Sequence, residues 1–335
     1  MNEDKKKRFK RLLFWLKVPI TVGLCGFILA NADWNNIFIA IQNAKTSFIL
    51  FAFFAILLNV VVTALKWKKI LEIHGISYPL WQLTAYYFTA GFFSNFLPGT
   101  IGGDGYRIYK TCQNPNSTMG AVLAVFTERV FGFMVLLALG LCGAVGSYLL
   151  TGDRFSLLGL IFGLSGLMAF TILVGILSLK RIQAWALKKE SIPQKIKMLI
   201  THLSDYRLQR TKFLHFIFVS IVFYFIIFIF WLLLIHAFGE ACSVFSLVMV
   251  VMISTVLAAL PISLNGIGIL DGSFIYLISQ FGVTYETALM VMVMQRMLVA
   301  VTSIIGGALY YLDRKPKEPA GQIREGIQSI KETAL

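Results

Sequence analysis

The chain has 335 residues, of which 58% are hydrophobic and only 14% are charged. Soluble domains average about 45–50% apolar and about 25% charged residues, so this composition excludes an ordinary soluble protein and indicates an integral membrane protein. The formal net charge of +14 is then expected to reflect membrane sidedness, and no nucleic-acid partner is predicted.

Six apolar runs are long enough to cross a bilayer, which takes about 20 residues of helix. The first run follows a basic segment at residues 1–11 and has no small-residue cleavage site behind it, so we expect a retained span and not a signal peptide. The six full spans are predicted at residues 12–31, 46–66, 118–150, 155–179, 213–238 and 284–312.

Basic residues gather on one side of these spans. They lie in the N-terminal segment, at residues 66–69, at Arg107 and Lys110, in the loop 180–212 and in the tail 313–335, whereas the opposite loops hold only Lys45 and Arg154. This bias predicts that both termini and the long loop are cytoplasmic. Within that loop, one apolar helical face beside many bases predicts a segment on the anionic inner leaflet, with a linker helix packed on the protein as the alternative.

Two further apolar stretches are too short, or too broken by Pro and Gly, to cross as one helix. Residues 81–97 end at Pro98 and the sequence GTIGGDG, and residues 243–260 end at Pro261 and the sequence SLNGIGILDG. Irregular backbone at membrane depth is tolerated only where protein buries it or where it lines a watery cavity. We therefore expect two re-entrant hairpins that mark a site.

The two halves of the chain repeat each other. A Leu-Pro dipeptide precedes each glycine-rich break, the pattern Asp-Gly-x-x-Ile-Tyr at residues 104–109 recurs at 271–276, and each of these aspartates is followed 25 residues later by an arginine, Arg129 or Arg296. The combination is a strong sign of an internal repeat, which should be sought before other patterns.

The predicted topology inverts the second copy relative to the first, with repeats at 46–150 and 213–312. The sequence thus predicts an all-α integral membrane protein with six full spans plus two re-entrant hairpins in an inverted repeat, within a membrane domain at 12–312. Inverted repeats with discontinuous helices are typical of secondary transporters, which bind substrate at the repeat interface.

Charged residues inside these segments need partners, because a charge in hydrocarbon costs at least about 2.5–3.5 kcal/mol. Asp104 with Arg129, and Asp271 with Arg296, would suffice as purely structural pairs. The functional hypothesis adds a phosphate headgroup, because a guanidinium offers five fixed donors and helix N-termini offer free N–H groups. The candidate phosphate-binding residues are Arg129, Arg296, Gly102, Gly103, Gly266 and Gly268.

Other polar residues near the breaks are candidates for supporting roles. Asp104 and Asp271 are alternatively helix N-caps. Glu128, whose counterpart is Gln295, is either a carrier of a coupling proton or a satisfied structural carboxylate. The remaining candidates either bind the headgroup or form hydrogen bonds with the backbone of the loops. They are Tyr109, Tyr276, Asn95 and Asn265.

No metal or cofactor site is predicted. The four cysteines and four histidines show no ligand spacing, and neither a P-loop nor a dinucleotide fingerprint is present. Glycines at 132, 140, 143 and 146 permit close helix packing, either within the chain or in a homodimer.

The combination of FLPGTIGGDGYRIYK, TERVFG, LPISLNGIGILDGS and QR resembles the lysylphosphatidylglycerol synthase transmembrane family, the flippase-like membrane domain of the bacterial multiple peptide resistance factor, over about residues 10–315. The resemblance implies a module of the bacterial cytoplasmic membrane that moves a phospholipid, an aminoacyl-phospholipid or a polyprenyl-phosphate lipid between leaflets. In the resistance factor, a fused cytoplasmic synthase makes the lysyl-lipid.

The residues after Leu312 are too few for such a synthase domain, so we expect a flippase module and favour transport over enzymatic activity. Two alternatives remain open from the sequence. One is a lipid-modifying enzyme of the phosphatidylglycerol lysyltransferase type, and the other is a membrane assembly partner of a separate lipid or cell-wall synthase.

Overall fold

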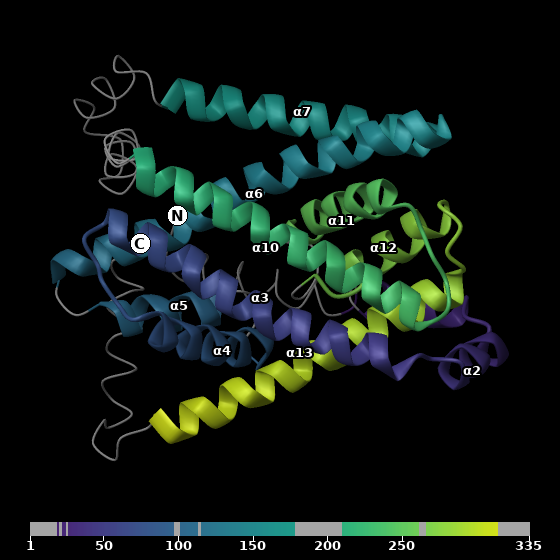
Figure 1. Cartoon of the computed structure of the whole chain (residues 1–335), viewed down its shortest axis with the longest axis horizontal. Coiled ribbons are helices and arrows are strands. Elements are labelled where there is room, and N and C mark those ends of the chain that lie inside the picture. Colours follow the sequence, from purple (N-terminus) through teal and green to yellow (C-terminus); the bar gives the residue numbers. More distant parts are fainter. Residues whose placement is uncertain are drawn as a thin grey trace. The chain divides into compact units, whose positions relative to one another are not determined.

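A computed structural model describes residues 19, 22–24, 26–96, 101–112, 115–177, 210–260 and 266–313. These residues form helices joined by short turns, and no strand occurs among them, which confirms the predicted all-α fold. The labelled helices (Figure 1) are α2 (Trp34–Gln42), α3 (Thr46–Ile73), α4 (Leu80–Phe96), α5 (Ile101–Thr111), α6 (Pro115–Thr151), α7 (Arg154–Leu177), α10 (Arg210–Ala237), α11 (Val244–Ala259), α12 (Ile269–Ser279) and α13 (Tyr285–Asp313).

Four described helices, α3, α6, α10 and α13, are long and apolar enough to cross a membrane. They coincide with the spans predicted at 46–66, 118–150, 213–238 and 284–312. The predicted span at 155–179 coincides with α7, of which Arg154–Ala169 counts as a shorter apolar helix. The sixth predicted span, 12–31, lies partly outside the described residues, so a count of six is not reached.

A sharp bend follows this first apolar segment. The short helix Val22–Ala30 is followed by α2 at an angle of 83°, and the two together could form a fifth, broken span. Asp33 caps α2, because its carboxylate accepts hydrogen bonds from the backbone N–H groups of Asn35 (2.9 Å) and Asn36 (3.4 Å). Helix α2 was not predicted and falls between two expected spans, although an aspartate before an apolar run is a recognised start signal for a helix.

Each predicted hairpin consists of two short helices. α4 packs against α5, and α11 packs against α12, as neighbouring ribbons in Figure 1. In each segment the structure has two separate helices, and Pro98 and Pro261 lie outside the described residues. The helix order long, short, short, long therefore occurs twice, as α3–α6 and α10–α13. That the hairpins are re-entrant and the copies inverted stays a prediction.

The chain divides into two compact units. The first unit comprises Met1–Ile56, Met134–Ala169 and Tyr224–Leu298, and it contains α11 and α12. The second unit comprises Leu57–Phe133, Phe170–Phe223 and Val299–Leu335, and it contains α4 and α5. The cytoplasmic linker predicted at 180–212 lies outside the described residues except for the first turn of α10.

Small residues let helices approach closely inside the first unit. A Cβ added at Gly140 of α6 would lie 2.2 Å from the sulfur of Met252 on α11, and one at Gly143 would lie 2.9 Å from the carbonyl oxygen of Phe245. These glycines therefore pack internally, one of the two roles expected for them. Three buried hydroxyls also join α6, α7 and α11, since Ser147 Oγ lies 2.7 Å from Ser156 Oγ and 2.9 Å from Ser246 Oγ.

Candidate functional site

In the second unit, the carboxylate of Asp104 forms ion pairs with two arginines. Asp104 lies in the first turn of α5 and Arg107 one turn later, so both project from one face of the helix and form an ion pair. Arg129 of α6 binds the same carboxylate through Nε, 2.9 Å from Asp104 Oδ2, and through a second guanidinium nitrogen. The pairing of Asp104 with Arg129 expected from the sequence is therefore present, and Arg107 is an additional partner.

Glu128, the residue before Arg129, is surrounded by three partners. Its carboxylate lies 3.2 Å from Lys66 Nζ and 2.8 Å from a guanidinium nitrogen of Arg107, and it accepts hydrogen bonds from the Tyr87 hydroxyl at 2.8 and 2.9 Å. Lys66, Arg107 and Glu128 are all buried, with side-chain exposures of only 6–8%. Two adjacent cations stabilise a charged carboxylate, which favours the structural role of Glu128 over that of a proton carrier.

We call these residues, contributed by α3, α4, α5 and α6, the charge cluster. Its members are Lys66, Tyr87, Asp104, Arg107, Glu128 and Arg129.

Aromatic rings pack against the buried cations of the charge cluster. The Arg107 guanidinium carbon lies 5.0 Å from the ring centre of Trp67 and 4.4 Å from that of Tyr87. Lys66 Nζ lies 4.3 Å from the ring centre of Phe223 on α10. Cation–π contacts of this length stabilise a charge that is shielded from water. They help to keep these two cations charged within the apolar surroundings.

Arg129 is the accessible edge of the charge cluster. Its side chain is 49% exposed, against 6% for the side chains of Lys66 and Arg107. Asp104 is 19% exposed, so it anchors Arg129 from the buried side. The arrangement presents a positioned guanidinium, with donors to spare, at the surface of the unit.

Three members of the charge cluster were not predicted from the sequence. Lys66 and Arg107 were expected in cytoplasmic basic stretches, and no role was expected for Tyr87. The structure instead buries both cations against Glu128 and the aromatic rings around it. The spacing of Asp104 and Arg107, three residues apart on a helix, was a signal that could have identified Arg107.

The first unit holds the corresponding pair of Asp271 and Arg296. Arg296 Nε lies 3.2 Å from Asp271 Oδ1, and a terminal nitrogen lies 3.0 Å from Oδ2, so the contact is bidentate. Asp271 Oδ2 also accepts a hydrogen bond from the backbone N–H of Gly268, 2.8 Å away, and so caps α12. Asp271 therefore both pairs and caps, combining the two alternatives from the sequence. Arg296 is 33% exposed and Asp271 13%.

The predicted glycines shape the two breaks. Gly266 and Gly268 have φ values of +74° and +83°, a left-handed conformation that strongly favours glycine. A Cβ at Gly103 would lie 2.2 Å from Ser94 Oγ and 2.6 Å from the carbonyl oxygen of Ala90, so this glycine allows α5 to approach α4. Gly102 lies in the first turn of α5. That their backbone N–H groups donate hydrogen bonds to a lipid headgroup stays a prediction.

The remaining candidates are dispersed. The Asn95 amide donates a hydrogen bond to the Ser303 hydroxyl, which joins α4 to α13 within the second unit. Tyr109 is partly buried on α5. Tyr276 is exposed, and its ring centre lies 6.3 Å from that of Phe155. Asn265 lies outside the described residues.

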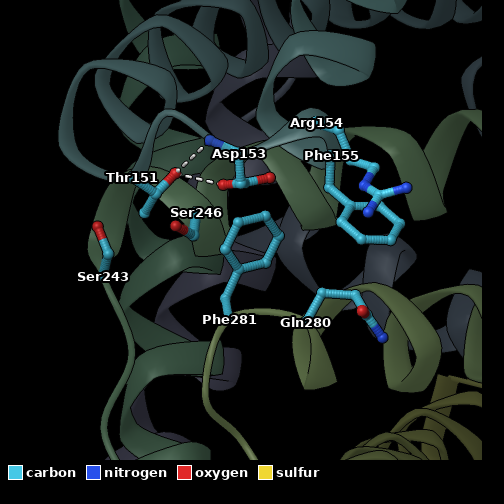
Figure 2. A pocket seen from close by; sticks show the side chains of 8 residues that line it. All are labelled: Thr151, Asp153, Arg154, Phe155, Ser243, Ser246, Gln280 and Phe281. Atoms are coloured by element: carbon cyan, nitrogen blue, oxygen red, sulfur yellow. Dashed lines mark hydrogen bonds between the residues drawn. The ribbon is translucent and has the colours of Figure 1, made fainter.

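A cavity of about 560 Å³ lies in the first unit, at the end of α12 away from Asp271. Figure 2 shows the hydrogen bonds between Thr151 and Asp153, with aromatic rings nearby. Burial opposes the charge of Asp153, but hydrogen bonds from Thr151 and Ser156 outweigh it and lower the pKa of this carboxyl. The lining contains no residue of the predicted site and consists of Thr151, Asp153, Arg154, Phe155, Ser243, Ser246, Gln280 and Phe281.

Within the described part of the chain, no group of three or more His, Cys, Asp or Glu side chains could hold a metal ion. The two sites are built from fixed charges: carboxylates bind guanidiniums whose outer donors remain accessible.

Comparison with known proteins identifies one family. The model of a family described as lysylphosphatidylglycerol synthase TM region matches residues 14–307. No match was found among curated proteins. The matched region includes both aspartate–arginine pairs and the whole charge cluster, and it agrees with the resemblance drawn from the sequence.

Proposed function

The chain belongs to the lysylphosphatidylglycerol synthase TM region family, and from that membership we propose that it is a lipid flippase of the bacterial cytoplasmic membrane. The family and the apolar helices support a membrane protein with a lipid-related function. Our proposal is more specific: the protein moves an anionic phospholipid, an aminoacyl-phospholipid or a polyprenyl-phosphate lipid between the two leaflets.

The observation that carries this proposal is the form of the two aspartate–arginine pairs. In each unit, a largely buried aspartate in the first turn of the second short helix holds an arginine of the following long helix. Arg129 and Arg296 nevertheless remain 49% and 33% exposed. An arginine that is fixed in place and still accessible is pre-organised to bind a phosphate, because less entropy is lost on binding.

The position of these pairs along the chain supports transport. Ionisable residues in membrane segments generally mark the path of a substrate or ion. Both pairs lie beside a break between two short helices, α4–α5 and α11–α12. Discontinuous helices that surround polar groups are the common construction of substrate sites in secondary transporters.

Transport of a fluorescent phosphatidylglycerol in proteoliposomes tests the proposal. Wild-type protein should expose inner-leaflet lipid to an external quencher, and Arg129→Ala and Arg296→Ala should each slow this at least about tenfold, since a charge-assisted hydrogen bond contributes about 1.5–3 kcal/mol. Lys68→Ala is the matched control, because it removes a cation of the second unit that lies 4.0 Å from Glu72, away from the charge cluster.

Wild-type transport rates in either arginine variant would refute the role of that arginine, and a wild-type protein that moves no lipid would refute the flippase. The family description also names a synthase, so the same preparation should be incubated with phosphatidylglycerol and lysyl-tRNA. Formation of lysyl-lipid without added synthase would favour the lipid-modifying enzyme. A protein inactive in both assays would favour an assembly partner.

A further inference from the structure

The charge cluster of the second unit contains more cations than anions. Lys66, Arg107 and Arg129 are positive, and Asp104 and Glu128 are the two carboxylates that hold them. The cluster therefore carries one positive charge in excess. In the first unit, Asp271 and Arg296 form a pair without excess charge.

The sequence repeat shows how this difference arises. In the shared pattern Asp-Gly-x-x-Ile-Tyr, Arg107 corresponds to Phe274, and Glu128 corresponds to Gln295. The ring of Phe274 stacks on Trp231, 4.5 Å between centres, much as the Arg107 guanidinium lies over Trp67. The same position beside a tryptophan is thus charged in one copy and apolar in the other.

The correspondence extends to α3 and α10. If Trp67 and Trp231 are equivalent, the preceding residues Lys66 and Phe230 are equivalent too. Phe230 is buried, as is Lys66. The second copy therefore has an aromatic ring where the first has the lysine that pairs with Glu128, and the copies differ at each buried charge.

We propose that the charge cluster selects a headgroup with one negative charge, a phosphodiester, whereas the Asp271–Arg296 pair, which carries no excess charge, contacts phosphate without setting this preference. This inference rests on the proposed function and names the substrate class of one of its two sites. An excess charge in an apolar surrounding is costly, so the cluster favours a ligand that supplies one negative charge.

The ligand would reach the charge cluster at Arg129. Arg129 is the most exposed of the three cations, and Asp104 fixes its guanidinium from the buried side. A phosphodiester balances one excess charge. A phosphomonoester at neutral pH carries about 1.5–2 negative charges and would exceed it. A zwitterionic headgroup leaves the net charge unbalanced.

Native mass spectrometry measures this preference. The intact protein is mixed with equimolar phosphatidylglycerol, phosphatidic acid and phosphatidylcholine, and the lipid that it retains is identified. Wild-type protein should retain phosphatidylglycerol. Arg129→Gln and Lys66→Met each remove the excess charge and should weaken that retention about 10- to 100-fold. Lys66→Met/Glu128→Gln removes one charge of each sign, and it should restore the preference for phosphatidylglycerol. Arg296→Gln weakens a phosphate contact but leaves the excess charge in place, so it should lower retention of the three lipids without changing their order of preference.

The outcomes separate the inference from the proposed function. A changed order of preference in Arg296→Gln, or no recovery in the double variant, would overturn the charge-balance site even if the wild type transports lipid. Preferred retention of phosphatidic acid would overturn the phosphodiester. If Lys66→Met does not fold, Asp104→Asn tests the same charge balance with all three cations kept: it raises the excess to two positive charges and should shift the preference toward phosphatidic acid. Absence of transport by the wild type refutes the function, whatever lipid it retains.

Discussion

At the scale of single residues, Glu128 is central to the charge cluster. It accepts the Tyr87 hydroxyl and contacts Lys66 and Arg107, and its side chain is only 8% exposed. Breaking a buried ion pair by removing one partner is far more costly than the net contribution of the pair, because the remaining charge stays buried. Glu128 should therefore be required for the stability of the protein as well as for the arrangement of the charge cluster.

Replacing Glu128 with alanine should lower the free energy of unfolding by about 3–5 kcal/mol, because Lys66 and Arg107 lose their shared carboxylate. The matched control is Gln295→Ala at the corresponding position, where the buried Oε1 atom lacks a hydrogen-bond partner. That change should cost about 1 kcal/mol or less. Unfolding in mixed micelles, followed by circular dichroism, measures both, and equal losses would contradict a stabilising role for the network.

The sequence predicted the aspartate–arginine pairs because the repeat duplicated both their identity and their spacing. It did not predict Lys66 and Arg107 as partners of Glu128, because basic residues near the end of an apolar run are normally counted as loop charges. Lys66 lies inside the protein because Glu128 and Phe223, which are far from it in the sequence, pack against it. Residues whose role depends on tertiary contacts lack a local pattern from which to predict them.

At the scale of helices, glycines determine how closely the short helices pack. In the second unit, Gly306 of α13 lies against α4: a Cβ added there would be only 1.9 Å from the carbonyl oxygen of Phe88. The Thr89 hydroxyl also donates to the Gly306 carbonyl, at 3.4 Å. Because the obstructing atom belongs to the backbone, a side-chain rotation cannot relieve the contact, and one helix must move.

Gly306→Ala should therefore destabilise the protein by about 1–3 kcal/mol, as overpacking does in other cores. Gly91→Ala is the control on α4 itself, because an added Cβ there meets no atom within 4 Å. Alanine favours helix over glycine by about 1 kcal/mol, so Gly91→Ala should be neutral or stabilising. Thermal unfolding in detergent compares the two, and a Gly306→Ala protein as stable as Gly91→Ala would contradict close packing of α4 and α13.

Helix type was predictable from the sequence, whereas helix partners were not. Apolar runs and Pro-Gly breaks located the four long helices and both pairs of short ones. The contacts of Gly140 and Gly143 with α11 could not be predicted, because a small residue permits close approach without specifying the neighbour. The nine-residue helix α2 was missed because a search for spans of about 20 residues passes over so short an element.

At the scale of the whole molecule, the distribution of basic residues predicts the orientation of the protein in the membrane. The prediction compares the number of basic residues in the loops on the two sides of the membrane. Lys66 and Arg107 are buried, so they no longer count among the cytoplasmic loop residues. Lys45 and Arg154 remain the only bases in the loops on the other side. Because the positive-inside rule depends on a large excess, the predicted cytoplasmic location of both termini is unchanged.

Cysteine labelling in intact bacterial cells tests this orientation. Arg154 and Lys212 are both exposed. A membrane-impermeant maleimide should label Arg154→Cys in intact cells and Lys212→Cys only after the cells are opened. The background should be a chain in which three native cysteines are replaced by serine: Cys25, Cys112 and Cys142.

The fourth cysteine provides its own control in this experiment. Burial, together with the nearby charge of Glu240, raises the pKa of Cys242 to about 11. The thiolate is the reactive form, so at pH 7 Cys242 should react far more slowly than an exposed thiol. At this pH its labelling should therefore stay far below that of Arg154→Cys. Labelling of Lys212→Cys in intact cells, with Arg154→Cys protected, would reverse the orientation and place the charge excess of the loops outside the cell.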